Sequence, residues 1–279
     1  MSTLIVEPDT QTRADVVPAA VIPFNERPRP LVYVGASAYE WKAECHFMDS
    51  LVAAMENCHS RIIRDWGVGD AAIGRKRNYQ AWRFLTQTKA DFLFFIDSDI
   101  VFEPVHFDRI VSHNLPVCAG VYFKKSAKLE PCLEGNLSEE DPITHLMKVK
   151  SAGTGFLCIR RDVFEAVRDM MLKEDPDNFC YEGDPDTETR WDFFPFGSRN
   201  RSYRSEDWYF CDLARRAGFD VHADCSVQLG HIGKTVFPLI RMGHSDVVDL
   251  LFHKYGYTQE QIKAWLLAAP EPATFEEKK

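Results

Sequence analysis

Between residues 31 and 123, short apolar runs alternate with stretches whose apolar residues recur at helical spacing. The runs predict strands over 31–35, 61–66, 92–96 and 116–123, and the periodic stretches predict helices near 47–55, over 74–89 and after Pro104. A chain that repeats strand, helix and strand builds a mostly parallel central sheet flanked by helices on both faces. The predicted fold class is therefore α/β, in a single domain.

The second half of the sequence is less regular. Residues 151–171 predict a glycine-bearing loop, a short strand and a helix, and residues 205–217 predict a helix that starts at Ser205. The long segment 175–204 between them is rich in Asp, Pro, Gly and aromatic residues, which predicts a partly ordered lid. A strand over 219–223 and a C-terminal helix over 258–269 complete the predicted elements.

Composition restricts the class of protein. Hydrophobic residues make up 45% of the 279 residues and aromatic residues 13%, which is enough for one large core and argues against disorder. The formal net charge of −9 does not indicate a protein held to nucleic acid by bulk charge. The first residues have no basic stretch followed by an apolar run, and no segment has 18 uninterrupted apolar residues. We therefore expect a cytoplasmic protein without a transmembrane segment.

The eight cysteines form no CxxC pair, so we expect free thiols rather than disulfides or a zinc site. We expect the chain to divide into an extended arm, a catalytic domain with two halves, and a tail. The corresponding ranges are 1–28, 29–268 with halves 29–125 and 126–268, and 269–279.

The stretch FLFFIDSDIVFEP (92–104) places two carboxylates directly after a buried strand. Burying a charge is costly unless it is paired or bound to a metal. In an open α/β sheet, ligands bind beyond the carboxyl ends of the strands, where Asp97, Ser98 and Asp99 are expected. Carboxylate oxygens suit Mg²⁺ or Mn²⁺, which proteins often share with the phosphates of a substrate. The pair therefore predicts a divalent cation and a phosphate-bearing ligand.

Two later motifs supply further candidates. Glu206 and Asp207 open the helix SEDWYFCDLARRAG, where acidic residues are also favoured by the helix dipole alone. Either one is a candidate general base that takes a proton from an acceptor hydroxyl. In LGHIGK, His231 lies between two glycines after a strand and could bind the same cation, and Lys234 could pair with a phosphate oxygen.

Two weaker motifs complete the set. In SAGTGF, Gly153 and Gly155 flank Thr154 and allow a close approach of the backbone to a ligand. The basic run GRKRN faces solvent in the usual interpretation, although Arg77 is a candidate for contact with a nucleotide.

Taken in order, these motifs resemble the GT-A glycosyltransferases, the family-2-like group in particular. The resemblance spans about residues 30 to 235 and rests on VYVGASAYE, GRKRNYQAW, FFIDSDIVF, SAGTGFLCIRR, SEDWYFC and LGHIG. It implies a GT-A-like fold and a hexosyltransferase type of activity that depends on Mn²⁺ or Mg²⁺ and a nucleotide-diphosphate sugar.

The resemblance also implies roles for individual residues. Asp97 would lie near the ribose or the metal, Asp99 would ligate the metal, and His231 would complete its coordination. Glu206 and Asp207 match the position that supplies the catalytic base in inverting members. The remaining residues would contact the nucleotide-sugar or border the acceptor: Gly35, Ala36, Ser37, Tyr39, Gly153, Thr154, Gly155 and Trp208.

Other functions remain open from the sequence. A sugar nucleotidyltransferase is an alternative, although VGASAYEWK is a poor version of its glycine-rich first loop. A nucleotide-sugar-binding module without turnover is a second alternative. The acceptor could be a saccharide, a lipid-linked saccharide, a protein side chain or a hydroxymethylated DNA base. The arginine-rich run GSRNRSYRSED (197–207) could hold a phosphate-bearing acceptor such as DNA.

Overall fold

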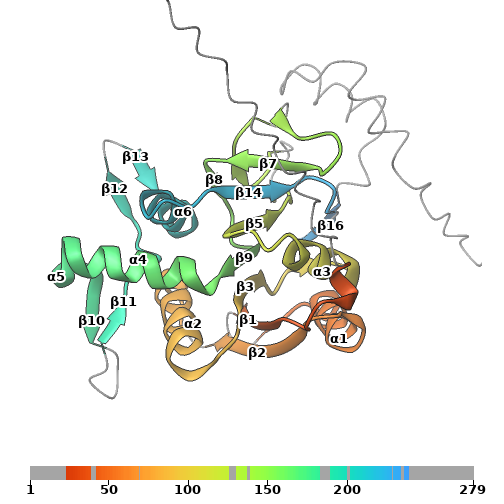
Figure 1. Cartoon of the computed structure of the whole chain (residues 1–279), viewed down its shortest axis with the longest axis horizontal. Coiled ribbons are helices and arrows are strands. Elements are labelled where there is room, and N and C mark those ends of the chain that lie inside the picture. Colours follow the sequence, from red (N-terminus) through yellow and green to blue (C-terminus); the bar gives the residue numbers. More distant parts are fainter. Residues whose placement is uncertain are drawn as a thin grey trace, which may run out of the picture.

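The computed structural model describes residues 23–38, 42–68, 70–125, 130–136, 139–182, 189–199, 202–227, 229–233 and 236–238. A seven-stranded sheet in the order β2-β1-β3-β9-β5-β14-β7 runs through these residues (Figure 1). Its strands are β1 (Leu31–Ala38), β2 (Arg61–Val68), β3 (Phe92–Asp97), β5 (Val117–Gly120), β7 (Leu146–Val149), β9 (Phe156–Arg160) and β14 (Val221–Asp224). Five strands share one direction, and β9 and β7 run against them. The predicted mostly parallel α/β sheet is confirmed.

Helices cover both faces of this sheet because its strands are apolar on both sides. In β3, Leu93 and Phe95 join one buried cluster, whereas Phe94 and Ile96 join another, as alternation along a strand requires. Helices α2 (Ile73–Gln87), α4 (Arg161–Glu174) and α6 (Glu206–Arg216) pack on the first cluster. Helices α1 (Cys45–Asn57) and α3 (Pro104–Ser112) pack on the second, so the two groups lie on opposite sides of the sheet (Figure 1).

The helix ends follow the signals in the sequence. At the start of α3, the Glu103 side chain accepts from the backbone N–H of His106, whose ring accepts from the backbone N–H of Glu103 at 3.1 Å. Helix α6 starts after Ser205 and stops before Gly218, whose φ of +92° favours glycine. These signals set the residue at which α3 begins and the residues at which α6 begins and ends.

The long segment 175–204 is ordered where it is described. It forms α5 (Pro176–Phe179) and two hairpins, β10 (Cys180–Glu182) with β11 (Thr189–Trp191), and β12 (Gly197–Arg199) with β13 (Ser202–Arg204). Between the hairpins, Phe193 and Phe194 are fully buried in the core. The amide of Asn78 ties this part to α2, because it accepts from the Phe194 N–H at 2.9 Å and donates to Asp192 at 2.6 Å. The role of this segment as a lid stays a prediction.

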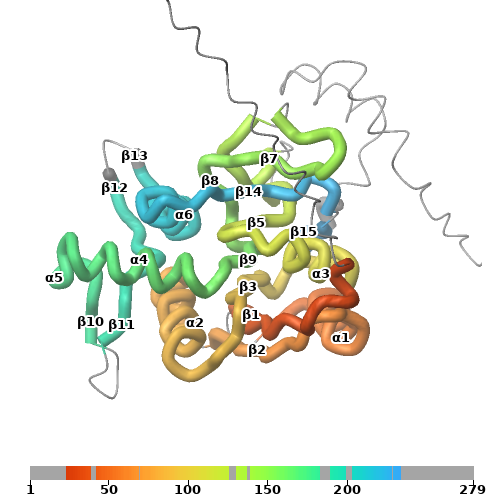
Figure 2. The backbone as a smooth tube through the Cα atoms, in the orientation of Figure 1, coloured from red at the N-terminus to blue at the C-terminus, as the bar shows by residue number. Residues whose placement is uncertain are grey.

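Short strands bring distant parts of the chain together. Strand β15 (Gly230–Ile232) lies between β16 (Val236–Pro238) and β4 (Ile100–Val101) in a three-stranded sheet. Strands β6 (Leu133–Glu134) and β8 (Ser151–Ala152) form a second small pair, and a 3-10 turn, η1 (Phe24–Glu26), precedes β1. Figure 2 shows β15, late in the chain, near α3, and β15 pairs there with β4, which directly precedes that helix.

Several predictions concern parts of the chain that lie outside the described residues. They are Tyr39, Lys234, most of the arm over 1–28, the helix over 258–269 and the tail. All eight cysteines are described, and each one is a free thiol, as predicted. Among the described helices, none combines the length and the apolar character needed to cross a bilayer.

Candidate active site

The candidate site lies at the carboxyl ends of β1 and β3. Asp97 is the last residue of β3 and is opposite Ser37 of β1 in the parallel register. The backbone N–H of Asp97 donates to the carbonyl of Gly155 at 3.0 Å, which brings the glycine loop to the same edge. The sequence motifs that contain Ser37, Asp97 and Gly155 are therefore neighbours in space.

The pairing of β4 with β15 brings His231 to Asp99. His231 is opposite Ile100 in this antiparallel pair, and the backbone N–H of Ile232 donates to the carbonyl of Asp99 at 2.7 Å. As a result, Nε2 of His231 lies 3.7 Å from Oδ1 of Asp99. Two residues far apart in the sequence thus point at one small space.

The chemistry of this pair fits a divalent cation. Nδ1 of His231 lies 2.7 Å from the carbonyl oxygen of Phe123, which can only accept, so Nδ1 carries the proton. In the neutral ring, Nε2 then presents its lone pair toward Asp99. Oδ1 of Asp99 is buried and has no hydrogen-bond partner among the described residues. A cation between these two atoms would satisfy both.

The described residues contain no group of three His, Cys, Asp or Glu side chains arranged for a metal. Asp99 and His231 would therefore supply two ligands, and water and the ligand's own phosphates would complete the shell. Mg²⁺ and Mn²⁺ are commonly held in this way, by one or two carboxylates together with phosphate oxygens. The donor set fits Mn²⁺ or Mg²⁺, although the metal itself stays a prediction.

Asp97 faces an arginine rather than the Asp99–His231 pair. The guanidinium of Arg77 donates to Asp97 Oδ1 at 2.9 Å through one nitrogen and pairs with Glu206 through another. Arg77 is only 3% exposed, so this link between β3 and α6 lies inside the protein. The predicted roles of Asp97 in metal binding and of Arg77 in nucleotide binding stay predictions, because both side chains already have internal partners.

Burial sets the protonation of this linked group. Burial lowers the pKa of Arg77, but the charges of Asp97 and Glu206 offset it and raise that pKa overall, so the guanidinium stays charged. Burial raises the pKa of Glu206 above its ordinary 4.5, against the lowering effect of Arg77. Glu206 pairs with Arg77 in this arrangement, and its role as a general base stays a prediction.

Asp207 is the more accessible of the two acids at the start of α6. It is half-buried, and its Oδ1 accepts from the Ser205 hydroxyl and from the Trp208 N–H at 2.7 Å. Ser205 therefore orients the Asp207 carboxylate instead of capping the helix with its side chain. Both of these contacts are made by Oδ1, and the carboxylate is partly exposed, so Asp207 is the more accessible candidate for the general base.

The two glycines of the loop over 153–155 are required by packing against Tyr122. A Cβ at Gly153 would lie 2.4 Å from the Tyr122 hydroxyl oxygen, and one at Gly155 would lie 2.6 Å from it. The N–H of Gly155 donates to that oxygen at 2.9 Å, and the Tyr122 ring meets the His231 ring edge-on at 5.2 Å. Thr154 is only 1% exposed. These glycines make room for a tyrosine that supports His231, and their direct contact with a ligand stays a prediction.

Two sequence interpretations need correction. Strand β1 does not end at Gly35 but continues through Ala38, so Gly35 and Ala36 lie inside the sheet, between β2 and β3, rather than in a loop. The basic run at the start of α2 does not face solvent as a whole, because Lys76 and Arg77 are buried. Burial lowers the pKa of Lys76, whereas exposed Arg75 pairs with Asp70 at 2.5 Å. Ser37 also lies in β1, where it is half-buried and opposite Asp97.

Lys125 is a site residue that the sequence interpretation missed. Its ammonium group pairs with Oδ2 of Asp99, the oxygen that does not face His231. Its signal in the sequence is weak, since one lysine of a pair after an apolar strand resembles an ordinary surface residue. The lysine adds a positive charge at the open side of the Asp99–His231 pair.

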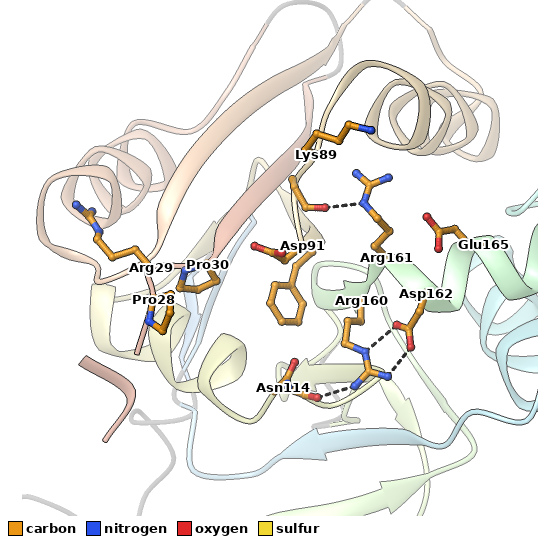
Figure 3. Close-up of a pocket in the computed structure, with 12 residues that line it drawn as sticks. Pro28, Arg29, Pro30, Lys89, Asp91, Asn114, Arg160, Arg161, Asp162 and Glu165 are labelled. Atoms are coloured by element: carbon orange, nitrogen blue, oxygen red, sulfur yellow. Dashed lines mark hydrogen bonds and ion pairs between the residues drawn. The ribbon is translucent and has the colours of Figure 1, made fainter. Parts of the chain in front are cut away.

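A separate hollow of about 530 Å³ lies at the opposite edge of the sheet (Figure 3). It lies where β3 starts and β9 ends, and its lining includes Arg29, Asp91, Arg160, Arg161, Asp162 and Glu165. This edge contains none of the residues predicted for the site.

Comparison with known proteins gives only distant matches. No family model matches the sequence, and no curated protein matches it. Among solved structures, A197 from STIV is 15% identical with a TM-score of 0.46, over 74% of this chain and 86% of that one. A glycosyltransferase involved in glycosylation of the major capsid of PBCV-1 is 10% identical with a TM-score of 0.31, over 53% and 70%.

Glucosyl-3-phosphoglycerate synthase from Mycobacterium tuberculosis, in complex with Mn²⁺, uridine diphosphate and phosphoglyceric acid, is 17% identical with a TM-score of 0.31. That match covers 48% of this chain and 57% of the synthase. Similarity at this level assigns no activity to the chain, so its function has to follow from its own side chains.

Proposed function

We propose that the chain is a glycosyltransferase that uses Mn²⁺ or Mg²⁺ to move a sugar from a nucleotide-diphosphate sugar to an acceptor hydroxyl. One observation carries the proposal: the buried Oδ1 of Asp99 has no partner among the described residues and faces Nε2 of His231 at 3.7 Å. An unpaired buried oxygen of this kind is costly unless a ligand completes it. A cation with a diphosphate would do so.

The residues around the pair support the rest of the reaction. A metal bound there would offset the negative charge that grows on the departing diphosphate. Asp207 takes the proton from the acceptor hydroxyl, whose oxygen then bonds to the anomeric carbon of the sugar. The bond from that carbon to the phosphate oxygen breaks, and the nucleoside diphosphate leaves with the electron pair. Arg77 pairs with both Asp97 and Glu206, and so holds the end of β3 close to the start of α6.

The proposal divides the domain by role. Residues 29–125 contain Ser37, Asp97 and Asp99 and are proposed as the half that binds the nucleotide-sugar. Residues 126–268 contain Asp207 and His231 and are proposed as the half that receives the acceptor. Trp208, half-buried beside Asp207, is the proposed border of the acceptor site.

The structure weakens the basis for a DNA acceptor. Arg204, in the arginine-rich run that suggested DNA, is 9% exposed and pairs with Asp212 at 2.7 Å and with Glu134 at 3.1 Å. An arginine held in this way is not free to meet a phosphate. The acceptor classes stay a saccharide, a lipid-linked saccharide, a protein side chain and, with less support, a hydroxymethylated DNA base.

A panel of UDP-, GDP- and CMP-sugars tests the proposal, with release of free nucleotide as the measurement. We expect release with at least one donor, dependence on Mn²⁺ or Mg²⁺, and loss of release in EDTA. Asp207→Asn should retain nucleotide affinity and lose transfer. Release of pyrophosphate would indicate a nucleotidyltransferase instead, and binding of a donor without any release would indicate a binding module.

A further inference from the structure

We propose that Lys125 is an exchangeable counter-ion of Asp99, which neutralises the carboxylate before a metal binds and then turns to the diphosphate of the donor. This inference rests on the proposed function. The two oxygens of the Asp99 carboxylate have different surroundings. Oδ1 of Asp99 is buried and faces His231, whereas Oδ2 pairs with the ammonium group of Lys125.

The contact made by Lys125 is the accessible one. The side chains of Lys125 and Asp99 are 35% and 31% exposed, so water reaches the ion pair. Such a pair contributes little to stability, because exposed ion pairs are screened and hold two side chains in one geometry. A lysine has a flexible stem of four carbons and three rotatable donors, so it can change partners without moving the backbone.

The segment directly before Lys125 is held by a backbone ladder. Residues Tyr122 to Lys124 pair with the chain over 130–132: the Cys132 N–H donates to the Tyr122 carbonyl, and the Lys124 N–H to the Glu130 carbonyl, both at 2.9 Å. Phe123, in the same ladder, holds Nδ1 of His231. The segment that leads into Lys125 therefore also positions the imidazole of His231.

Charge decides which partner Lys125 takes. A divalent cation next to Asp99 repels the ammonium group, and both then compete for one carboxylate. A diphosphate that arrives with the metal offers the lysine several charged oxygens as new acceptors. Removal of the lysine charge should consequently have opposite effects on the two ligands, with tighter binding of the metal alone and weaker binding of the nucleoside diphosphate.

The neighbouring residue Lys124 provides a matched control. It pairs with Glu130 at 3.4 Å, and its side chain is 50% exposed. Lys124→Met and Lys125→Met remove the same charge from adjacent positions of one ladder, so they separate a general loss of positive charge from the contact with Asp99.

The experiment measures Mn²⁺ binding to the full chain by calorimetry, and then UDP and GDP binding at saturating Mn²⁺. We expect Lys125→Met to bind Mn²⁺ about three- to tenfold more tightly and the nucleoside diphosphate about three- to tenfold more weakly. Lys124→Met should change neither value, and Lys125→Arg should stay close to the parent chain in both.

Unchanged or weaker Mn²⁺ binding by Lys125→Met, beside normal binding by the parent chain, would overturn the exchange and leave the lysine a structural role. A fall in melting temperature for Lys125→Met together with loss of both ligands would do the same. Failure of the proposed function looks different, because it is seen in the parent chain, which then either binds no Mn²⁺ or binds the donor without releasing nucleotide.

Discussion

Charged residues lie at both ends of strand β3, but their hydrogen bonding differs between the two ends. At its start, in the hollow of Figure 3, Arg160 donates to both oxygens of Asp162, at 2.7 and 2.5 Å, and to the Asn114 carbonyl at 3.0 Å. Arg161 donates to the carbonyls of Ala90 at 2.7 Å and Phe84 at 2.9 Å, near the end of α2. The charges at this end are used to hold the fold together.

At the other end, some polar atoms have no partner among the described residues. Oδ1 of Asp99 and Nε of Arg77 are both buried and unpaired there. Buried polar atoms are paired in most native structures, so each exception calls for an explanation such as a ligand. The comparison teaches that a hollow with charged walls is weak evidence for a site, whereas an unpaired buried oxygen at a sheet edge is stronger evidence.

The sharpest test of this comparison replaces one carboxylate at each end of β3. Asp99→Asn should lower transfer by about 10²- to 10³-fold, the range for loss of one preorganised electrostatic group. Asp91→Asn, at the start of the strand, should leave transfer unchanged, because Asp91 accepts from the Leu31 N–H and an amide oxygen can do the same. Nucleotide release and melting temperature are measured for both variants. Full activity of a folded Asp99→Asn variant would remove Asp99 from the site.

A second test compares one arginine at each end. Arg77→Met should lower the free energy of unfolding by about 3–5 kcal/mol, because it leaves Glu206 buried without its partner. Arg160→Met should lower it by at most about 1 kcal/mol, since both members of the Arg160–Asp162 pair are partly exposed. Urea unfolding measures both changes. Equal decreases in the free energy of unfolding would mean that the arginines at the two ends contribute equally to stability.

The smallest effect concerns pH, and its sign differs between the two ends. The raised pKa of Glu206 means that the folded chain binds more protons than the unfolded chain, so its contribution to stability falls as pH rises above about 4.5. The pKa of Asp162 is lowered below 3.8, chiefly by its hydrogen bonds from Arg160, so its contribution grows as pH rises toward that value.

Two amide variants isolate these contributions in unfolding curves recorded at several pH values. Above about pH 4.5, Glu206→Gln should lose stability with rising pH less steeply than the parent chain. Below about pH 4, the parent chain should gain stability over Asp162→Asn as pH rises. Parallel curves for parent and variant in either window would contradict the assigned shift.

Much of the fold could be predicted because its strands and helices carry strong apolar patterns. The run over 92–96 could only be a buried strand, and its alternation supplies both faces of the sheet with apolar side chains. The end of β1 was mispredicted because Gly35 and Ala36 resemble a loop. They stay in the sheet because β2 and β3 continue on both sides, and a Cβ at Gly35 would lie 3.1 Å from Phe95.

The direction of β9 and the partners within the site were harder to predict. A five-residue apolar run carries no sign of its direction, so the antiparallel insertion of β9 between β3 and β5 was not foreseen. Lys125 and Arg77 resemble surface residues in the sequence, since what holds them are carboxylates from distant segments. Local patterns indicate where a chain is apolar, but they do not say which charges will meet.

The ladder between β4 and β15 has a consequence for protein synthesis. Asp99 is made long before His231, yet the two come together only through the pairing of His231 with Ile100. A nascent chain still attached to the ribosome before β15 emerges has its acidic pair but lacks the imidazole. The centre is therefore assembled late, after most of the sheet has been translated.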